Sequence, residues 1–275
     1  MHSRAATLGI SIVLFEPDLA EVEHTCSSLL AAIVQAQSAG RLGRSELWLI
    51  DNGGGARAIA SAAARFAGAG LRVHEVRGQG NIGYGRGHNL ALCHSDTDFF
   101  LVLNPDVQLA PNALEEALRF MTVETRVLLL SPRVTNARGE QIFLCKRYPS
   151  VFDFLLRGFA PNWAKRLFDR RLARYEMREE TRDRVVLGIE IVSGCFMFLR
   201  RAAIEATGGF DPAYFLYFED FDLSWRLAQT GNIAYVPSVS IVHAGGHAAR
   251  KGWHHLRLFA AAGRIFFGKH GWKLW

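Results

Sequence analysis

The sequence predicts an α/β protein in which a doubly wound, mostly parallel sheet is flanked by helices. Short apolar runs recur through the first half of the chain, and stretches with helical spacing separate them. The runs are rich in Val, Ile and Leu, as is typical of strands that are buried on both faces. With 275 residues, of which 49% are hydrophobic and 21% charged, the chain can bury a sizeable core, and disorder or fibrous repeats are excluded.

The elements are expected to alternate from the N-terminus onward. Residues 8–15 (LGISIVLF) predict a strand, and Asp18 is a suitable N-cap for a helix that continues to about residue 39. Acidic residues follow this apolar run without a small-residue cleavage site, so we interpret it as a strand and not as a signal peptide. The next expected elements are a strand at 47–51, a helix from about 55, a strand at 71–76, a helix to about 94, a strand at 99–103, a helix opened by Pro111 and a strand at 127–130.

The alternation ends near residue 131. An Arg-rich stretch with helical spacing follows, and then we expect one long strand from Val185 to Leu199. A helix should open near Asp220, and apolar runs at 233–236 and 239–242 predict the last strands. The four cysteines are scattered without a CxxC pair, which argues against a zinc site or a disulfide framework and favours a reducing cytosol.

Positive charge is concentrated in two segments. Residues 146–184 hold 11 Lys/Arg and 6 Asp/Glu, and residues 246–275 hold 6 Lys/Arg and no acid, whereas the rest of the chain is net acidic. Large apolar residues such as Trp253 and Phe267 alternate with the bases of the second segment, which suits an anionic membrane surface or a lipid-diphosphate acceptor. The alternative is a terminal helix that packs on the sheet. No nucleic-acid-binding motif accompanies the charge, so we expect no nucleic acid partner.

Polar residues follow three of the predicted strands. They are Asp51 and Asn52, the segment Asn81–Asn89, and the run Asn104-Pro105-Asp106. Ligands of open parallel sheets bind at the carboxyl ends of the strands. A single Asp at such a place is usually a turn or cap residue. Three in succession supply what a nucleotide site needs: an acceptor for a base N–H, glycines that allow close approach, and a carboxylate for a metal.

The segment Asn81–Asn89 (NIGYGRGHN) superficially resembles a dinucleotide-binding fingerprint. Its GxGxG spacing differs from GxGxxG, and it follows the third strand instead of the first, which argues against a nicotinamide enzyme. A loop that lets a nucleotide-sugar lie across the sheet is the functional interpretation. A glycine-rich turn without a ligand is the alternative.

A second acidic cluster, Phe218-Glu-Asp-Phe-Asp222, opens the helix near Asp220. Acids in a first helical turn are stabilised by the helix dipole, which would explain them without any chemistry. Glu219 and Asp220 are, however, surrounded by aromatic residues, and desolvation would raise their pKa values toward those of a useful base. His243 follows the last predicted strand. A single His there is more often structural.

Together these segments resemble the bacterial family-2 glycosyltransferases, in particular the rhamnosyltransferase-like group that builds surface polysaccharides. The resemblance covers about residues 8–270, and the order and spacing of the pieces carry it. The matching segments are LIDNG (49–53), NIGYG (81–85) with Asn89, LNPDV (103–107), SGCFMFLRR (193–201), GGFDP (208–212), YFEDFDL (217–223) and Val236-Pro237 before His243.

The resemblance implies a GT-A fold and an inverting transferase that uses a nucleoside-diphosphate sugar (dTDP- or UDP-linked) with Mg²⁺ or Mn²⁺. It implies that Asp51, with Asn52 beside it, binds the uracil or thymine ring and that Asp106 carries the metal, because Asn104 replaces the first acid of the family's DxD motif. The other implied roles are a loop around the nucleotide and diphosphate for Asn81, Gly83 and Asn89, the general base for Asp220, its acidic neighbour for Glu219, and a metal or diphosphate ligand for His243.

We therefore divide the chain into a GT-A domain over residues 1–249 and a basic aromatic C-terminal helix over 250–275. Within the domain, a nucleotide-sugar half extends to about residue 130 and an acceptor half covers 131–249. The expected function is transfer of a sugar, with rhamnose from dTDP-rhamnose favoured, to a lipid-linked or polysaccharide acceptor at the cytoplasmic face of the cell membrane. Alternatives are transfer of another hexose or galactofuranose from a UDP-sugar, and a non-catalytic nucleotide-sugar-binding subunit. A homodimer remains open.

Overall fold

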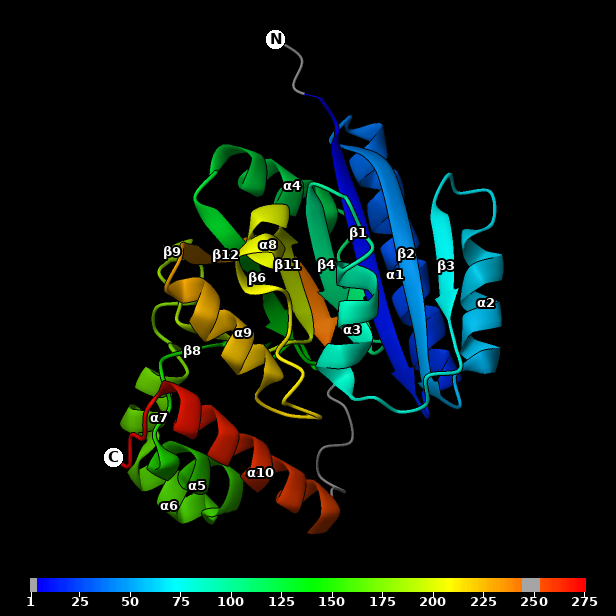
Figure 1. Cartoon of the computed structure of the whole chain (residues 1–275). Coiled ribbons are helices and arrows are strands. Elements are labelled where there is room, and N and C mark those ends of the chain that lie inside the picture. The colour runs from blue at the N-terminus through cyan, green and yellow to red at the C-terminus, as the bar shows by residue number, and fades with distance from the viewer. Residues whose placement is uncertain (1–3, 244–252) are drawn as a thin grey trace.

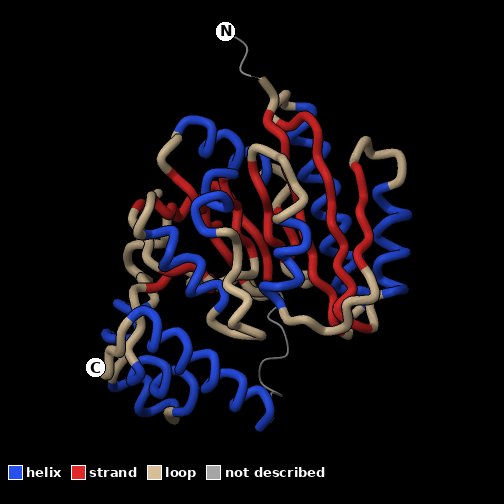
Figure 2. The backbone as a smooth tube through the Cα atoms, viewed as in Figure 1, coloured by secondary structure: helices blue, strands red, loops and turns tan. Residues whose placement is uncertain are grey.

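A ten-stranded sheet forms the centre of the part of the chain that the computed structural model describes, residues 4–243 and 253–275 (Figures 1 and 2). Its strands are β1 (Ala6–Phe15), β2 (Leu42–Gly53), β3 (Arg72–Val76), β4 (Phe99–Leu103), β5 (Val107–Leu109), β6 (Val127–Thr135), β7 (Gln141–Ile142), β9 (Val186–Leu187), β11 (Phe196–Arg200) and β12 (Asn232–His243). The order across the sheet is β3-β2-β1-β4-β11-β6-β12-β5, with β7 beside β6 and β9 beside β12. The pairs among β3, β2, β1 and β4 are parallel, as is β6 with β12, whereas β11 runs antiparallel to both its neighbours.

Helices cover both faces of this sheet, as Figure 1 shows. On one face lie α1 (Leu19–Ser38), α2 (Ala56–Phe66) and α4 (Ala113–Val123); on the other lie α3 (Tyr84–Leu92), α8 (Arg201–Thr207) and α9 (Glu219–Ala228). Strand side chains alternate between the two cores: Ile10 and Ile12 of β1 join the first, and Val13 joins the second. The predicted doubly wound α/β architecture is therefore confirmed. So is the predicted N-cap, because the Asp18 carboxylate accepts hydrogen bonds from the amides of residues 20 and 21.

The Arg-rich stretch and the C-terminal segment form a separate group of helices, which we call the helical lobe. It consists of α5 (Val151–Phe159), α6 (Asn162–Leu167), α7 (Asp169–Tyr175) and α10 (Trp253–His270), and it lies beside the sheet next to α9 (Figure 1). Phe266 of α10 is fully buried in an aromatic cluster with Phe218 and Phe221, so α10 packs on the domain. The predicted boundary between residues 249 and 250 lies outside the described residues.

One predicted element is wrong. In place of a single strand from Val185 to Leu199, the chain forms β9, β10 (Ile191–Val192) and β11. Gly188 breaks the run because it adopts a left-handed conformation (φ +75°). The short β10 pairs outside the main sheet with β8 (Cys145–Lys146). This break brings Ser193 and Gly194 to the edge of the sheet where β4 ends.

Both halves of the chain contribute strands to the one sheet, and β6 crosses the division that we place near residue 130. Within the described ranges, no helix has both the length and the apolar character that a bilayer span requires.

Candidate active site

The carboxyl ends of β1, β2 and β4 meet at one edge of the sheet, and a cavity of about 800 Å³ opens there. Five of the predicted donor-binding residues line it: Asn52, Asn81, Gly83, Asn104 and Asp106. They come from separate segments because parallel strands place their following loops side by side.

Two side-chain amides shape the loop that precedes α3. Asn52 donates from Nδ2 to the carbonyl oxygen of Gly83 at 3.0 Å, and the amide of Gly83 donates to Oδ1 of Asn81 at 3.1 Å. Gly83 has a positive φ of +92°, and a Cβ atom there would lie 2.2 Å from the carbonyl oxygen of Phe215. No other residue fits at this position, so the loop is fixed from within before any ligand arrives.

Two predicted donor-binding residues lie outside the lining of this cavity. Oδ1 of Asp51 accepts hydrogen bonds from the amides of Gly53 and Gly55, at 2.9 and 3.0 Å. Asn89 makes two hydrogen bonds to the backbone of Phe210: its Nδ2 donates to the Phe210 carbonyl oxygen, and its Oδ1 accepts from the Phe210 amide. Both side chains therefore hold loops that border the site, and their contact with a donor remains a prediction.

Tyr84 was not singled out from the sequence, although it belongs to the NIGYG segment. Its hydroxyl lies 2.9 Å from Oδ1 of Asn104 and 2.7 Å from the carbonyl oxygen of Gly194. Burial raises the pKa of this phenol well above its ordinary value, so it acts as a hydrogen-bond donor. Tyr84 thus ties the end of β4 to the segment that leads into β11.

Asp106 and His243 form a pair across the sheet edge. The register between β5 and β12 places His243 opposite Val107, and its Nε2 lies 3.1 Å from Oδ2 of Asp106. Burial alone would raise the pKa of Asp106, but the hydrogen bond and charge of His243 outweigh it and hold that pKa below its usual value. Oδ1 of Asp106 is buried and has no hydrogen-bond partner among the described residues.

These two side chains fit a divalent cation that is shared with a substrate. An unpartnered carboxylate oxygen and an imidazole are suitable ligands, and Mg²⁺ in phosphate sites is commonly held by one or two carboxylates plus substrate oxygens. Within residues 4–243 and 253–275, no group of three or more His, Cys, Asp or Glu side chains could hold a metal ion. Among the described residues, Asp106 and His243 alone leave coordination positions open for further ligands.

The second acidic pair opens α9. Tyr217 and Phe218 precede it, and both have left-handed conformations (φ +72° and +63°), which are costly for residues other than glycine. This turn directs Glu219 and Asp220 into the interior. Asp220 accepts hydrogen bonds from the amides of Gly194 at 2.7 Å and Phe221 at 2.9 Å. Oε2 of Glu219 is buried and has no partner within residues 4–243 and 253–275.

Burial raises the pKa of both Asp220 and Glu219, and the charge of Asp220 raises that of Glu219 further. Asp220 is the member of the pair that backbone amides stabilise as a carboxylate. Two carboxyl groups so close together favour a state with a single negative charge, and the geometry places that charge on Asp220. The arrangement can accept a proton at near-neutral pH.

A second cavity, of about 440 Å³, opens beside the acid pair and is lined by both acids, by Ser193 and by side chains of the helical lobe. Arg157 of α5 is among them, half-exposed and paired with Glu176 at 3.1 Å. Nothing in the sequence distinguished Arg157 from the other arginines of its stretch. Its place in the site follows only from how the lobe packs on α9.

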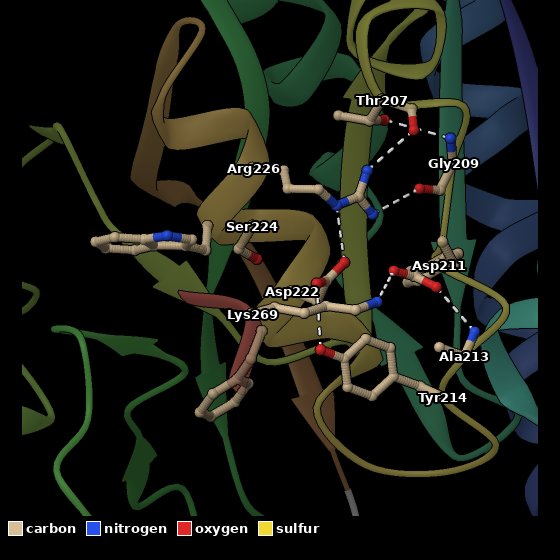
Figure 3. A network of polar contacts seen from close by, with 12 residues as sticks. Thr207, Gly209, Asp211, Ala213, Tyr214, Asp222, Ser224, Arg226 and Lys269 are labelled. Carbon is tan, nitrogen blue, oxygen red and sulfur yellow. Dashed lines mark hydrogen bonds and ion pairs between the residues drawn. The ribbon is translucent and has the colours of Figure 1, made fainter. Parts of the chain in front are cut away.

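Asp222 belongs to a structural network instead of the cavity (Figure 3). This fully buried carboxylate pairs with Arg226 at 2.7 Å, and the Tyr214 hydroxyl lies 3.3 Å away. It also pairs with His270 of α10 at 2.8 Å. Arg226 also donates to the carbonyl oxygens of Thr207 and Gly209. The third acid of the cluster thus fixes α9 against α10 and the loop after α8.

Known proteins match this chain in sequence and in fold. Residues 20–208 match the family described as glycosyl transferase family 2. Two relatives from Mycobacterium tuberculosis strains, each named N-acetylglucosaminyl-diphospho-decaprenol L-rhamnosyltransferase, are 30% identical over 185 residues, 61% of this chain and 57% of theirs. The rhamnosyltransferase WbbL of Escherichia coli is 24% identical over 182 residues, 62% of this chain and 64% of its own. The chain thus spans less than two thirds of the length of these relatives.

Solved structures show the same fold at low sequence identity. The mannosyltransferase PcManGT from Pyrobaculum calidifontis, solved with GDP-Man and Mn²⁺, gives a TM-score of 0.59 at 16% identity, covering 92% of this chain and 60% of that one. TarS 1-349 of S. aureus gives 0.56 at 11% identity, covering 96% and 72%. The GT-A fold that the motifs imply is therefore confirmed. Because the family match covers more than half of its residues, the chain belongs to glycosyl transferase family 2.

Proposed function

We propose that this protein transfers a sugar from a nucleoside-diphosphate sugar to a lipid-linked or polysaccharide acceptor, with inversion at the anomeric carbon. The observation that carries the proposal is that Gly194 contacts residues of both cavities. The amide of Gly194 donates to Asp220, and its carbonyl oxygen accepts from the Tyr84 hydroxyl, which also lies against Asn104. Asp106 and the desolvated base Asp220 thus line two cavities that the contacts of Gly194 connect, as a donor and an acceptor require.

The chemistry follows from this arrangement. As the acceptor hydroxyl attacks the anomeric carbon, its proton passes to the Asp220 carboxylate and the bond from that carbon to the diphosphate breaks on the opposite side. One base suffices for such a direct displacement. Asp106 and His243 would hold Mg²⁺ or Mn²⁺, which supplies charge neutralisation for the leaving diphosphate. The Mn²⁺ in the PcManGT complex supports this proposal.

Rhamnose from dTDP-rhamnose is the donor that we favour, supported by the names of the mycobacterial and Escherichia coli relatives. Asp51 would accept a hydrogen bond from N3–H of thymine or uracil, so a UDP-hexose or UDP-galactofuranose is the rival within the class. The mycobacterial relatives' names also support a diphospho-polyprenol acceptor and a place in cell-surface glycan synthesis. Because a lipid-linked acceptor of this kind lies in a membrane, we propose that the protein acts as a peripheral protein at the cytoplasmic face of that membrane.

A donor panel tests the proposal. Purified protein is incubated with dTDP-rhamnose, UDP-hexoses, GDP-mannose and ADP-glucose, with Mn²⁺ or with EDTA, and thermal stabilisation and donor hydrolysis are measured. The proposal predicts stabilisation by a thymidine or uridine donor in Mn²⁺ only, because ligand binding stabilises the native state. Slow hydrolysis of the same donor should accompany it. Binding without hydrolysis or transfer would support the rival interpretation, a non-catalytic nucleotide-sugar-binding subunit, and no stabilisation by any donor would contradict both.

A further inference from the structure

The cavity beside the acid pair continues into a groove in the helical lobe. The groove has a volume of about 780 Å³ and is lined by α5, α10 and the turn before α9. Four side chains line both spaces, so the two adjoin: Phe154, Phe218, Leu256 and Phe259. One end of the combined space reaches Glu219 and Asp220, and the other reaches Trp272 near the chain end.

The two parts of this space differ in chemistry. The groove is walled almost wholly by aliphatic and aromatic side chains, and Arg264 is its one charged lining residue within the described part of the chain. Gly263 also lines the groove, and a side chain there would be in tight contact with Phe218, because its Cβ atom would lie 3.3 Å from the Phe218 ring. Where the groove meets the acid pair, Arg157 lines the wall. Its Nε atom is paired with Glu176, and a guanidinium has five N–H donors, so the described residues leave donors of Arg157 available.

An apolar groove with a cation at its inner end matches one kind of molecule. A lipid whose chain fills the groove would carry its anionic group to Arg157, and whatever is attached to that group would lie at Asp220. Segments 146–184 and 246–275, whose described parts contain the helices of the lobe, are the two strongly basic parts of the chain. They complement a doubly charged diphosphate better than a neutral headgroup.

We propose that this groove binds the first isoprene units of a polyprenyl-diphosphate-linked acceptor, with Arg157 on the diphosphate. The inference rests on the proposed function and assigns a binding site to the lipid part of its acceptor. An apolar chain enclosed between α5 and α10 is removed from water along its length, whereas a lipid that stays in the bilayer would leave the groove empty. The groove thereby positions the acceptor hydroxyl at Asp220.

Calorimetric titration with farnesyl diphosphate tests this inference, with EDTA present so that no divalent ion recruits the probe to the donor cavity. Wild-type protein should bind farnesyl diphosphate at least about tenfold more tightly than inorganic diphosphate, and geranyl diphosphate should fall between them, because each isoprene unit buries further apolar surface. Equal affinity for all three probes would overturn the inference.

A matched pair of variants localises the binding. Ala260 and Ala261 are both exposed on α10, but only Ala260 lines the groove. Ala260→Trp should weaken farnesyl diphosphate binding by about tenfold or more, as filling the space of one isoprene unit would. Ala261→Trp should bind like the wild type, and both variants should unfold at the wild-type temperature. Equal binding by the two variants would contradict the inference.

The outcome separates this inference from the proposed function. Groove-dependent binding of farnesyl diphosphate without sugar transfer from any donor would overturn the proposed function and leave the lipid site standing. Sugar transfer that Ala260→Trp does not impair, with either a long or a short acceptor chain, would overturn the lipid site alone.

Discussion

Among the three acids that open α9, the contacts of each side chain decide its role. Asp220 is held as a carboxylate by two backbone amides and lines the 440 Å³ cavity. Glu219 lines the same cavity but has a buried oxygen without a partner among the described residues, and Asp222 is committed to Arg226 and His270. Only Asp220 combines a fixed orientation, an accessible face and a raised pKa.

Asp220→Asn tests this assignment. The amide is nearly isosteric with the carboxylate but cannot accept a proton, so sugar transfer should fall by roughly 10²–10⁴ while donor affinity stays unchanged. Steady-state transfer rates and calorimetry of donor binding measure the two effects. If Asp220→Asn retained its rate and Glu219→Gln lost it, the base would have to be reassigned to Glu219.

Glu219 should also make the stability of the protein depend on pH. Burial raises its folded-state pKa above the ordinary value of 4.5, so the folded state binds this proton more tightly than the unfolded state. The free energy of unfolding should therefore fall as pH rises from the unfolded pKa through the folded one, by about 1.4 kcal/mol per pH unit in that window.

Glu219→Gln removes this titration. Relative to the wild type, the variant should gain stability as pH rises above about 4.5 and gain no more above the folded pKa. Urea unfolding from pH 4 to 9 in EDTA measures the difference. Parallel curves for the two proteins would show that Glu219 does not titrate with a raised pKa.

At the scale of elements, α10 is part of the site wall. His255 and Leu258 line the 800 Å³ cavity at the strand ends, whereas Leu256 and Phe259 line the 440 Å³ cavity beside the acid pair. The contact of Asp222 with His270 ties this helix to α9, and Lys269 of α10 also pairs with Asp211 in the network of Figure 3. Packing at this junction sets where the wall that α10 forms lies relative to Asp220.

Arg226→Met tests how firmly that junction is held. It leaves the fully buried Asp222 without its guanidinium partner, so the free energy of unfolding should fall by about 3–5 kcal/mol. Lys269→Met removes the nearby pair with Asp211, whose members are 40% and 26% exposed, and should cost about 0–1 kcal/mol. Chemical unfolding compares them, and equal effects would contradict the account of the junction.

The sequence predicted elements where local pattern decides them. Residues 99–103 form the predicted strand without any shift, and Asp18 caps α1 as expected. The break at Gly188 was missed because the apolar pattern continues through it, and only the left-handed backbone reveals the turn. In the site, the strand-end acids were visible from local motifs. The contacts of Asn89 with Phe210 and the place of Arg157 arise from residues far apart in the chain, which no local pattern records.

At the scale of the whole molecule, exposed apolar side chains gather on the helical lobe. Seven large ones from its helices and the chain end are more than half exposed: Leu155, Trp163, Leu167, Trp253, Trp272, Leu274 and Trp275. Exposed aromatic residues together with basic ones suit an anionic membrane surface, and each basic residue near such a surface contributes about 1 kcal/mol.

Co-sedimentation with vesicles tests this surface. Binding should require anionic lipid, weaken with salt and weaken further in Trp163→Ala. Val123→Ala, on α4 and also highly exposed, serves as the control and should bind like the wild type. Equal sedimentation with neutral vesicles, or none with either kind, would show that the lobe does not dock on an anionic membrane.

The proposed sugar transfer is a single displacement at the anomeric carbon with Asp220 as the only base. The most direct test is the anomeric configuration of the product, determined by NMR after transfer from dTDP-rhamnose to a polyprenyl-diphosphate-linked sugar. One carboxylate that activates the acceptor hydroxyl predicts a glycosidic bond of configuration opposite to that of the donor. A product that retains the donor configuration would contradict the account.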